Sequence, residues 1–314
     1  MDVRTACEWV ASVATHVRLD DAALGRLAGE LAAAPDPPAW GSPHLVDADA
    51  EHVAGWTLLL SALNFSFWQD EPRWRVRGAD GYMALAHALR RAVDDDRLPV
   101  WRPSLWTEWS VRDLESVLRG DEGGPAHPPM LAERHAVAAE LGTWLVAAHG
   151  GSALGLLDAA GSAASLAQTM GRSLRLFRDV AEYRGRRVPL LKRAQIAAND
   201  CGAALGARAP AGLLDRSGLT AFADYKLPQV LRAAGAMVYT PQLAASVDAR
   251  IELAAGSEQE IEIRALTVVA VDRLVPLLAA RGRSAGATLV DAMLWWRGQG
   301  LHAQPYHRVR TIWY

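Results

Sequence analysis

Helical periodicity, interrupted at intervals by proline and glycine, is the feature that most limits how this chain can fold. Residues 20–34 place Leu24, Leu27 and Leu31 on one helical face, and the proline cluster at 35–38 ends the pattern. Comparable Ala- and Leu-rich stretches predict further helices over residues 53–67, 81–93, 131–148, 152–168 and 189–196, and after Ser257 and Ser284. We therefore expect a mainly α-helical fold.

Two local signals refine this expectation. Ser257 and Glu260 have the spacing of a capping box ahead of a helix, and Pro189 stands where proline is favoured, at the start of one. Residues 73–77 (RWRVR) alternate polar and apolar side chains and run into Gly78. This alternation predicts a strand, and we expect a small β-hairpin near residues 73–78.

The breaker-rich segment 121–129 (DEGGPAHPP) is the best candidate for a boundary between lobes. A chain of 314 residues is long enough for two lobes. We expect an N-terminal helical lobe over residues 1–125, which carries the small β element, and a C-terminal helical lobe over residues 126–314.

Composition excludes several classes of protein. The formal net charge is −2, so there is no general basic field to hold tRNA or DNA, and we expect no stable nucleic-acid binding. The uncharged run 53–69 contains polar residues and is better interpreted as a buried helix than as a membrane span. With two cysteines, Cys7 and Cys201, and no recognisable secretion signal, we expect a cytoplasmic protein that binds no membrane.

Common cofactor and metal motifs are missing. The sequence has no GxxxxGK[ST], no GxGxxG after a strand, no HExxH and no GxSxG, and its nine histidines show no metal-ligand pairing. We expect neither a cofactor nor a metal.

Asp291 stands in an apolar setting. On a helix its neighbours at i+3 and i+4 are Leu294 and Trp295, so its carboxyl group shares a face with a large apolar surface. Burial there is unfavourable without a partner or a substrate. The ordinary alternative is an ion pair with Arg297 or Arg283.

Phe222, Asp224 and Lys226 alternate along the chain, and an extended segment points all three to one side. An aromatic ring, a carboxylate and an ammonium group together suit a planar heterocycle that carries N–H donors. The alternative is a helix N-cap beside a packed aromatic side chain. His16 alone suggests a surface or capping histidine.

Lysine is nearly absent from the chain. Of 33 basic residues only Lys192 and Lys226 are lysines, which is either chance under a strong arginine bias or a need for a compact ammonium group. The C-terminal stretch 305–314 combines aromatic residues with His307 and Arg308, and it either contacts a phosphate or seals the core.

Taken together, these segments resemble the queuosine salvage protein family. The resemblance rests on the following stretches, which follow the family in order over nearly the whole chain: 56–68 (WTLLLSALNFSFW), 81–92 (GYMALAHALRRA), 188–200 (VPLLKRAQIAAND), 219–235 (LTAFADYKLPQVLRAAG), 256–274 (GSEQEIEIRALTVVAVDRL) and 291–314 (DAMLWWRGQGLHAQPYHRVRTIWY). The resemblance implies hydrolysis of queuosine 5′-phosphate, a mononucleotide, to the base queuine and ribose 5-phosphate. It also implies a two-lobed helical fold similar to helix-hairpin-helix DNA glycosylases, of whose hairpin residues 227–230 (LPQV) are a faint trace.

The resemblance further implies roles for individual residues. Asp291 matches the catalytic aspartate, Phe222 and Asp224 match the base-binding pair, and His16 is taken as the histidine that contacts the base. As ligands for the phosphate or ribose we expect members of the set Lys226, Lys192, His307 and Arg308. In this interpretation Asp291 stabilises positive charge at C1′ and orients or deprotonates the attacking water.

Two other functions remain open at this point. One is a non-catalytic module that binds queuosine-modified tRNA or nucleotides, and the other is a helical scaffold whose tryptophan-rich surfaces bind partners. For the oligomeric state we favour a monomer.

Overall fold

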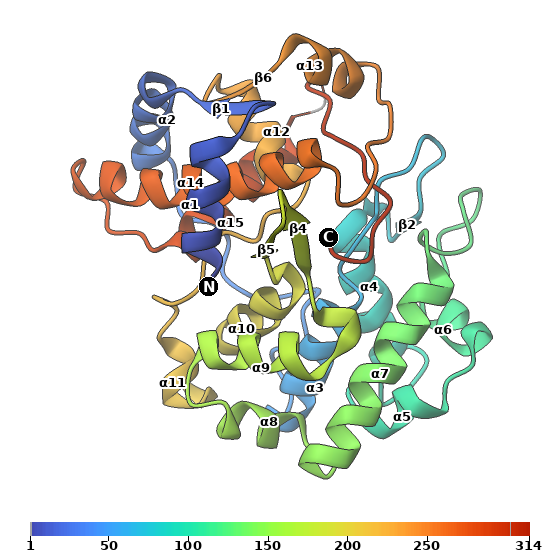
Figure 1. Cartoon of the computed structure of the whole chain (residues 1–314). Coiled ribbons are helices and arrows are strands. Elements are labelled where there is room, and N and C mark those ends of the chain that lie inside the picture. Colours follow the sequence, from blue (N-terminus) through green and yellow to red (C-terminus); the bar gives the residue numbers. More distant parts are fainter. Residues whose placement is uncertain (1, 302) are drawn as a thin grey trace.

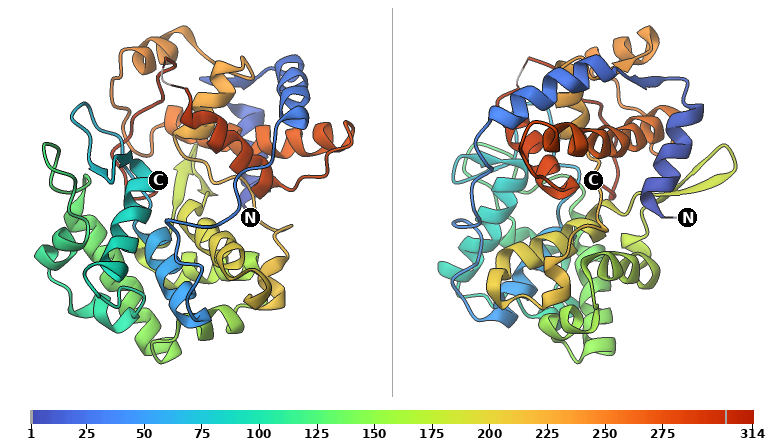
Figure 2. Two further views of the ribbon diagram at one scale, coloured as in Figure 1. Left: turned by 180° about the vertical axis from the view of Figure 1, so that it is seen from behind. Right: turned by 90° about the vertical axis from the view of Figure 1, so that its left-hand side faces the viewer.

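The structure is a computed structural model that describes residues 2–301 and 303–314. It is mainly helical, as predicted, and its elements pack around two separate hydrophobic clusters (Figure 1). In Figure 1 one group of helices occupies the lower half of the molecule and the other the upper half, and the two views in Figure 2 show the same separation.

The first cluster is built from residues between 45 and 219. The elements around it are α3 (Ala50–Ala62), β2 (Arg75–Val76), β3 (Ala79–Asp80), α4 (Gly81–Asp94), α5 (Pro103–Glu108), α6 (Val111–Val117), α7 (Leu131–His149), α8 (Ala153–Ala159), α9 (Ala163–Ser173), the 3₁₀ turns η1 (Arg175–Phe177) and η2 (Gly206–Arg208), α10 (Lys192–Leu205) and α11 (Ala211–Leu214). Helix α3 is buried all round, as expected for the uncharged run that begins near residue 53.

The second cluster joins the two ends of the chain, because its residues come from 6–31 and from 183–294. The elements around it are α1 (Val3–Val13), β1 (Val17–Leu19), α2 (Asp21–Ala33), β4 (Val180–Tyr183), β5 (Arg186–Pro189), α12 (Lys226–Ala233), β6 (Met237–Tyr239), α13 (Pro241–Asp248), α14 (Glu258–Ala279) and α15 (Ala287–Gln299). The long helix α14 packs against both α1 and α2.

The strands form small antiparallel pairs. In the predicted hairpin, β2 pairs with β3 in the register Arg75↔Asp80 and Val76↔Ala79. Its turn residues Arg77 and Gly78 both have positive φ, as a tight two-residue hairpin turn requires. The other pairs are β1 with β6 and β4 with β5.

Several predicted helix ends are confirmed. Helix α2 begins after the Asp20 cap, α7 spans the predicted range, and α14 starts at the expected cap, where the Ser257 hydroxyl accepts from the amide of Glu260. The reciprocal half of that capping box is different, since the Glu260 carboxylate accepts from the amide of Gly256.

The helix predicted over residues 53–67 ends early, at Ala62. The carbonyl groups that would continue it are bound by buried cations instead: Arg193 donates to Ala62 O at 2.7 Å, and Arg134 donates to Leu63 O. Such side-chain donors satisfy the carbonyls at a helix end and remove the need for another turn.

Two further helix predictions are wrong. The stretch 152–168 forms two helices, α8 and α9, because Gly161 takes a left-handed conformation and Ser162 caps a new start. The predicted start at Pro189 fails because that residue ends β5, which pairs with β4, and α10 begins only at Lys192.

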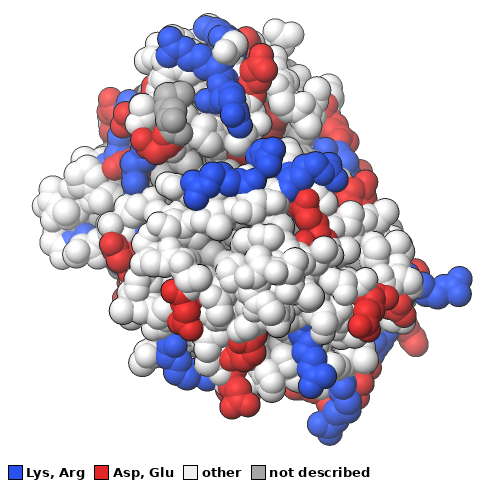
Figure 3. Space-filling model, turned by 60° about the horizontal axis from the view of Figure 1, so that its bottom comes forward, with Lys and Arg blue, Asp and Glu red and all other residues white. Residues whose placement is uncertain are grey.

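The first hydrophobic cluster contains residues from both sides of the predicted lobe boundary at 125/126. The segment 121–129 itself is the loop between α6 and α7. On the face seen in Figure 3, acidic and basic side chains are interspersed, and a row of basic ones crosses it. Within the described ranges, no α-helix has the length and hydropathy needed for a membrane crossing.

A substitution at Gly55 tests how closely α3 packs against the backbone of Trp101. A Cβ atom at Gly55 would lie 2.0 Å from the Trp101 carbonyl oxygen, so we expect Gly55→Ala to lower the free energy of unfolding by roughly 1–3 kcal/mol, measured by chemical denaturation. Gly25, also inside a helix, has open space at the same position and is the control. Gly25→Ala should raise stability by up to about 1 kcal/mol, and equal effects of the two substitutions would contradict the close approach.

Candidate functional site

Two adjoining cavities lie where elements of the two hydrophobic clusters meet. Helix α10 from the first cluster contributes to both, as do the loop before α12 and helix α15 from the second. The residues that line both cavities are Asn64, Tyr82, Met83, Lys192, Asp224 and Trp295. The shared wall makes the cavities neighbouring halves of one site.

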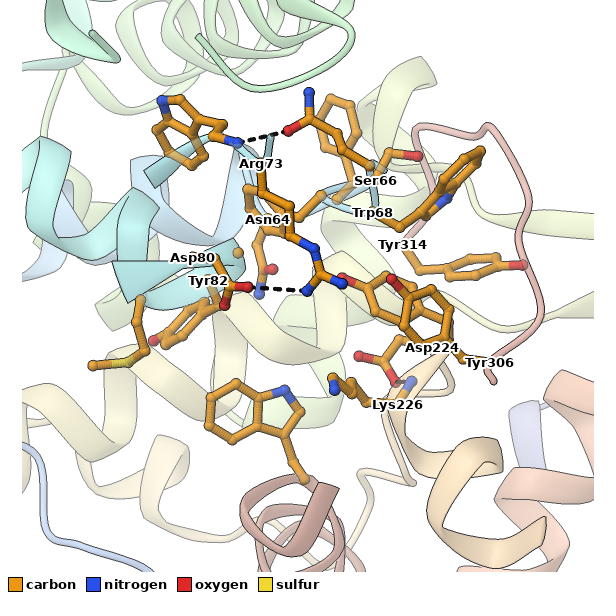
Figure 4. A pocket seen from close by; sticks show the side chains of 18 of the residues that line it. Asn64, Ser66, Trp68, Arg73, Asp80, Tyr82, Asp224, Lys226, Tyr306 and Tyr314 are labelled. Carbon is orange, nitrogen blue, oxygen red and sulfur yellow. Dashed lines mark hydrogen bonds and ion pairs between the residues drawn. The ribbon is translucent and has the colours of Figure 1, made fainter. Parts of the chain in front are cut away.

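The first cavity is polar and carries positive charge. Figure 4 shows Arg73 and Lys226 pointing towards the same space, with Tyr306 along one side. Arg73 forms ion pairs with Glu71 and Asp80, each at 3.2 Å, which offset much of its charge. Among the described residues, the Lys226 ammonium group donates to neutral oxygens only, Gln229 Oε1 at 3.3 Å and Gly298 O at 3.2 Å.

The second cavity is lined mainly by aromatic and aliphatic side chains. Its apolar lining residues are Pro38, Ala39, Trp40, Ile196, Phe222, Leu227, Ala292, Trp295 and Trp296. Among these stand a few polar groups, including Asp291, Asp200 and His44. A pocket with apolar walls and a small number of convergent polar groups is typical of a site for an organic ring system.

Asp291 lies on α15 and is almost completely buried. Its Oδ1 accepts the amide N–H of Phe222 at 2.7 Å. Burial raises the pKa of Asp291 to about 8, against the opposing effect of that hydrogen bond. The alternative ion pairs are not formed, because Arg297 pairs with Glu30 and Arg283 with Asp36.

Asp224 lies just before α12 and lines both cavities. Its Oδ1 accepts the amides of Lys226 at 2.7 Å and Leu227 at 3.2 Å, so it makes the predicted alternative, an N-terminal helix contact. Burial raises the pKa of Asp224, whereas Lys192 and the two amides oppose the rise. The contact leaves the carboxyl group on the wall that the cavities share.

Lys192 starts α10 and also lines both cavities. Its Nζ donates to the Asn64 carbonyl at 3.1 Å. Burial lowers the pKa of Lys192 to about 8, while the charges of Asp224 and Asp291 act in the opposite direction. The ammonium group therefore stands among the acids of the site.

Sequence reasoning missed His44 and Tyr82. Nδ1 of His44 lies 2.9 Å from the Gly41 carbonyl, which can only accept, so Nδ1 carries the hydrogen and Nε2 accepts from the Tyr82 hydroxyl at 2.9 Å. Burial lowers the pKa of His44, which keeps the ring neutral. Nothing in its proline-rich loop separates His44 from the other histidines, because its contact to Tyr82 is made only in the folded chain.

Three predicted residues do not line either cavity. His16 lies beside Glu262, which accepts its amide at 2.6 Å, on the strand pair β1–β6 side of the molecule. His307 is buried against the Tyr314 hydroxyl, and burial lowers its pKa to about 3. Arg308 forms an ion pair with Asp70 at 2.7 Å. The C-terminal stretch nevertheless contributes Tyr306 and Tyr314 to the first cavity.

One group of potential metal ligands occurs among the described residues: His16, Glu258 and Glu262. The Glu262 carboxylate already accepts the amides of Thr15, His16 and Val17 and the Tyr183 hydroxyl. These donors occupy its lone pairs, so the group fits a structural role better than a metal site.

Comparison with known proteins places the chain in a family. The sequence model described as "Queuosine salvage protein" matches residues 44–314. Proteins named queuosine 5′-phosphate N-glycosylase/hydrolase are similar over nearly the whole length. That of Sphaerobacter thermophilus is 38% identical over 100% of this chain and 98% of its own, and that of Mus musculus is 33% identical over 99% and 98%. That of Dictyostelium discoideum is 30% identical, again over 99% and 98%. The chain therefore belongs to the queuosine salvage protein family.

Proposed function

We propose that this protein hydrolyses the N-glycosidic bond of queuosine 5′-phosphate and releases queuine and ribose 5-phosphate. The names of its full-length relatives support this activity. The structural observation that carries the proposal is the pair of joined cavities, one polar and cationic and the other apolar, with carboxyl groups at and beside their shared wall. A mononucleotide has the same order of parts: phosphate, sugar and ring.

The phosphate fits the first cavity, where Arg73 and Lys226 supply positive charge. The deazapurine ring fits the second, against Phe222 and Trp295. The ribose then lies at the shared wall, beside Asp224 and Lys192. His307, Arg308 and His16 are not part of this proposal, because they do not line the cavities.

The two aspartates differ in environment, and this difference suggests their roles. Burial raises the pKa of Asp224, but two amide donors and Lys192 oppose the rise, so we assign the carboxylate role to Asp224. Asp291 has one amide donor and a pKa raised to about 8, so it is mainly protonated at neutral pH. The resemblance predicts Asp291 as the catalytic group and Asp224 as a base ligand. In our proposal both act in catalysis, Asp224 on the sugar and Asp291 on the leaving base.

The reaction balances with these roles. Water adds its hydroxide to C1′ while the C1′–N bond breaks and its electron pair stays with the base. Asp224 stabilises positive charge on the ribose and takes the proton from water, and the protonated Asp291 gives its proton to the glycosidic nitrogen, which keeps the electron pair of the broken bond. The ring nitrogen that is normally protonated in a purine is a carbon in queuine, so the negative charge on the leaving base has to be neutralised at another atom. Proton return from Asp224 to Asp291 through solvent completes the cycle.

Further expectations from the sequence stay predictions. They are a fold similar to helix-hairpin-helix DNA glycosylases, a monomer, a cytoplasmic location and no stable nucleic-acid binding. Residues 227–230, the faint trace of the glycosylase hairpin, lie within helix α12.

Release of queuine from queuosine 5′-phosphate, followed by mass spectrometry, tests the activity directly. We expect Asp224→Asn and Asp291→Asn each to fold and to lower kcat by at least about 100-fold, the scale of losing one preorganised charge or proton donor. Arg297→Gln, which removes an exposed ion pair on the same helix as Asp291, is the control. Near-normal turnover in either aspartate variant would remove that residue from the mechanism.

The pH dependence of the activity shows whether Asp291 acts in its protonated form or as a carboxylate. If the protonated form works, activity is present below a pH of about 8 and is lost as the pH rises through that value. Lys192 titrates in the same range, so the Asp291→Asn profile is needed as well. We expect the residual activity of the Asp291→Asn variant not to fall as the pH rises through 8. A wild-type rate that increases through pH 8 would show that the carboxylate of Asp291 is the active form.

A substitution at Phe222 tests whether the base binds in the second cavity. We expect Phe222→Ala to weaken the binding of queuine by roughly tenfold in calorimetry, because an aromatic contact contributes about 0.5–1.5 kcal/mol beyond its buried area. The affinity for ribose 5-phosphate should change little. Equal losses for both ligands would place the ring elsewhere.

A further inference from the structure

The backbone that follows α3 is held in an unusual way. Every carbonyl from residue 62 to residue 66 accepts a hydrogen bond from a buried cationic side chain. Arg193 donates to Ala62 O at 2.7 Å and Lys192 donates to Asn64 O at 3.1 Å. Arg134 donates to the carbonyls of Leu63, Phe65 and Ser66, the last at 3.4 Å.

These cations lack carboxylate partners. No carboxylate oxygen of the described residues lies within 4.0 Å of the charged groups of Arg134, Arg193 or Lys192. Among acidic groups, Asp179 has the largest effect on the pKa of Arg193, but its carboxylate forms an ion pair with Arg264 at 2.7 Å. Their other neighbours are carbonyl groups and aromatic rings. Arg134 also donates to Pro129 O, and Arg193 to Leu176 O. The Arg134 guanidinium lies 4.3 Å from the centre of the Phe65 ring.

Burial of unpaired charge is costly, and neutral donors such as glutamine could also bind carbonyl groups. The exposed fractions of Arg134 and Arg193 are 0% and 2%. Burial lowers the pKa of both guanidinium groups to about 9, so both stay charged at neutral pH. Binding of the carbonyls alone therefore does not account for the charge.

The position of residues 62–66 beside the first cavity offers a reason for the buried charge. Residues 64–69 form one wall of the first cavity, and Asn64, Ser66 and Trp68 are visible along it in Figure 4. The guanidinium group of Arg134 binds the carbonyls of Phe65 and Ser66 in this wall. Arg193 binds Ala62 O, just before the wall, and its guanidinium group lies 5.0 Å from the centre of the Phe65 ring. Neither arginine lines the cavity itself. In a poorly solvated region charges act over several ångströms with little screening, so both contribute positive potential to the cavity.

We propose that Arg134 and Arg193 are positioning residues for the anionic part of the substrate. Arg134 holds the wall of the first cavity, Arg193 holds the backbone just before it, and both supply uncompensated charge that a phosphate neutralises. They touch no substrate themselves. This inference rests on the proposed function, in which the phosphate occupies the first cavity. The two arginines add to the charge of the cations that line the cavity, Arg73, Lys192 and Lys226, and so favour a phosphorylated nucleoside.

The test compares two ligands by calorimetry: ribose 5-phosphate, which carries the anion, and queuine, which does not. We expect Arg134→Gln and Arg193→Gln each to weaken the binding of ribose 5-phosphate by about tenfold and to leave queuine affinity within about twofold. Arg193→Lys keeps the charge and should restore most of the ribose 5-phosphate affinity. In kinetics, we expect the glutamine variants to raise KM for queuosine 5′-phosphate more than they lower kcat.

Arg91→Gln is the matched control, because Arg91 also binds backbone carbonyls, those of Val117 and Arg119, but lines neither cavity. It should leave both affinities unchanged. If Arg134→Gln does not fold, Arg193→Gln carries the same test, since Arg193 holds only Ala62 O in this segment.

Two results would overturn the inference. Equal losses for queuine and ribose 5-phosphate would indicate a purely structural role for the arginines, and so would an Arg193→Lys variant no better than Arg193→Gln. Failure of the proposed function has a different signature: the wild-type protein would bind ribose 5-phosphate with the expected dependence on Arg134 and Arg193 but release no queuine from queuosine 5′-phosphate.

Discussion

The hydrogen bond from the Phe222 amide to the Asp291 carboxyl group connects the parts of this site. It ties helix α15 to the loop before α12, and so it fixes Asp291 relative to Phe222 and, two residues later, Asp224. Asp224 is itself held by the first amides of α12. The acids are therefore positioned by backbone donors rather than by counter-ions, which leaves their remaining oxygens available to a ligand.

Several charged side chains of this protein are buried at or near the site. Burial raises the pKa of Asp224 and Asp291 and lowers that of Lys192, and the attraction between the ammonium group and the two acids opposes these shifts. Arg134 and Arg193 add positive charge near the first cavity. Such an arrangement is costly for an empty site, and a bound dianion together with a flat ring compensates it better than water does.

The sequence predicts those features that are local and periodic. Helices α2, α4 and α7 and the β2–β3 hairpin follow from apolar spacing and turn residues, and the apolar neighbours of Asp291 on its helix are enough to single it out. The early end of α3 does not follow from local sequence because its cause, Arg134 and Arg193, lies far along the chain. The strand at Pro189 escapes prediction for a similar reason, since its partner β4 decides its conformation.

The same distinction applies to site residues. Local patterns, the rarity of lysine or the family resemblance point to Phe222, Asp224, Lys192 and Lys226, and all of them line the cavities. No local pattern distinguishes His16 from His44, so the sequence does not show which of the two lines a cavity. Only the folded arrangement brings His44 next to Tyr82 and keeps His16 with Glu262.

The pairing of α1 and α2 with α14 has a consequence for synthesis on the ribosome. The apolar faces of these first helices, with Leu24, Leu27 and Leu31, find their partner only after residues near 279 have been made. The elements between residues 45 and 219 can meanwhile condense around their own cluster. The amino-terminal helices of the nascent chain therefore lack α14 as a partner through most of translation, and apolar surface exposed in this way is the kind that chaperones protect from aggregation.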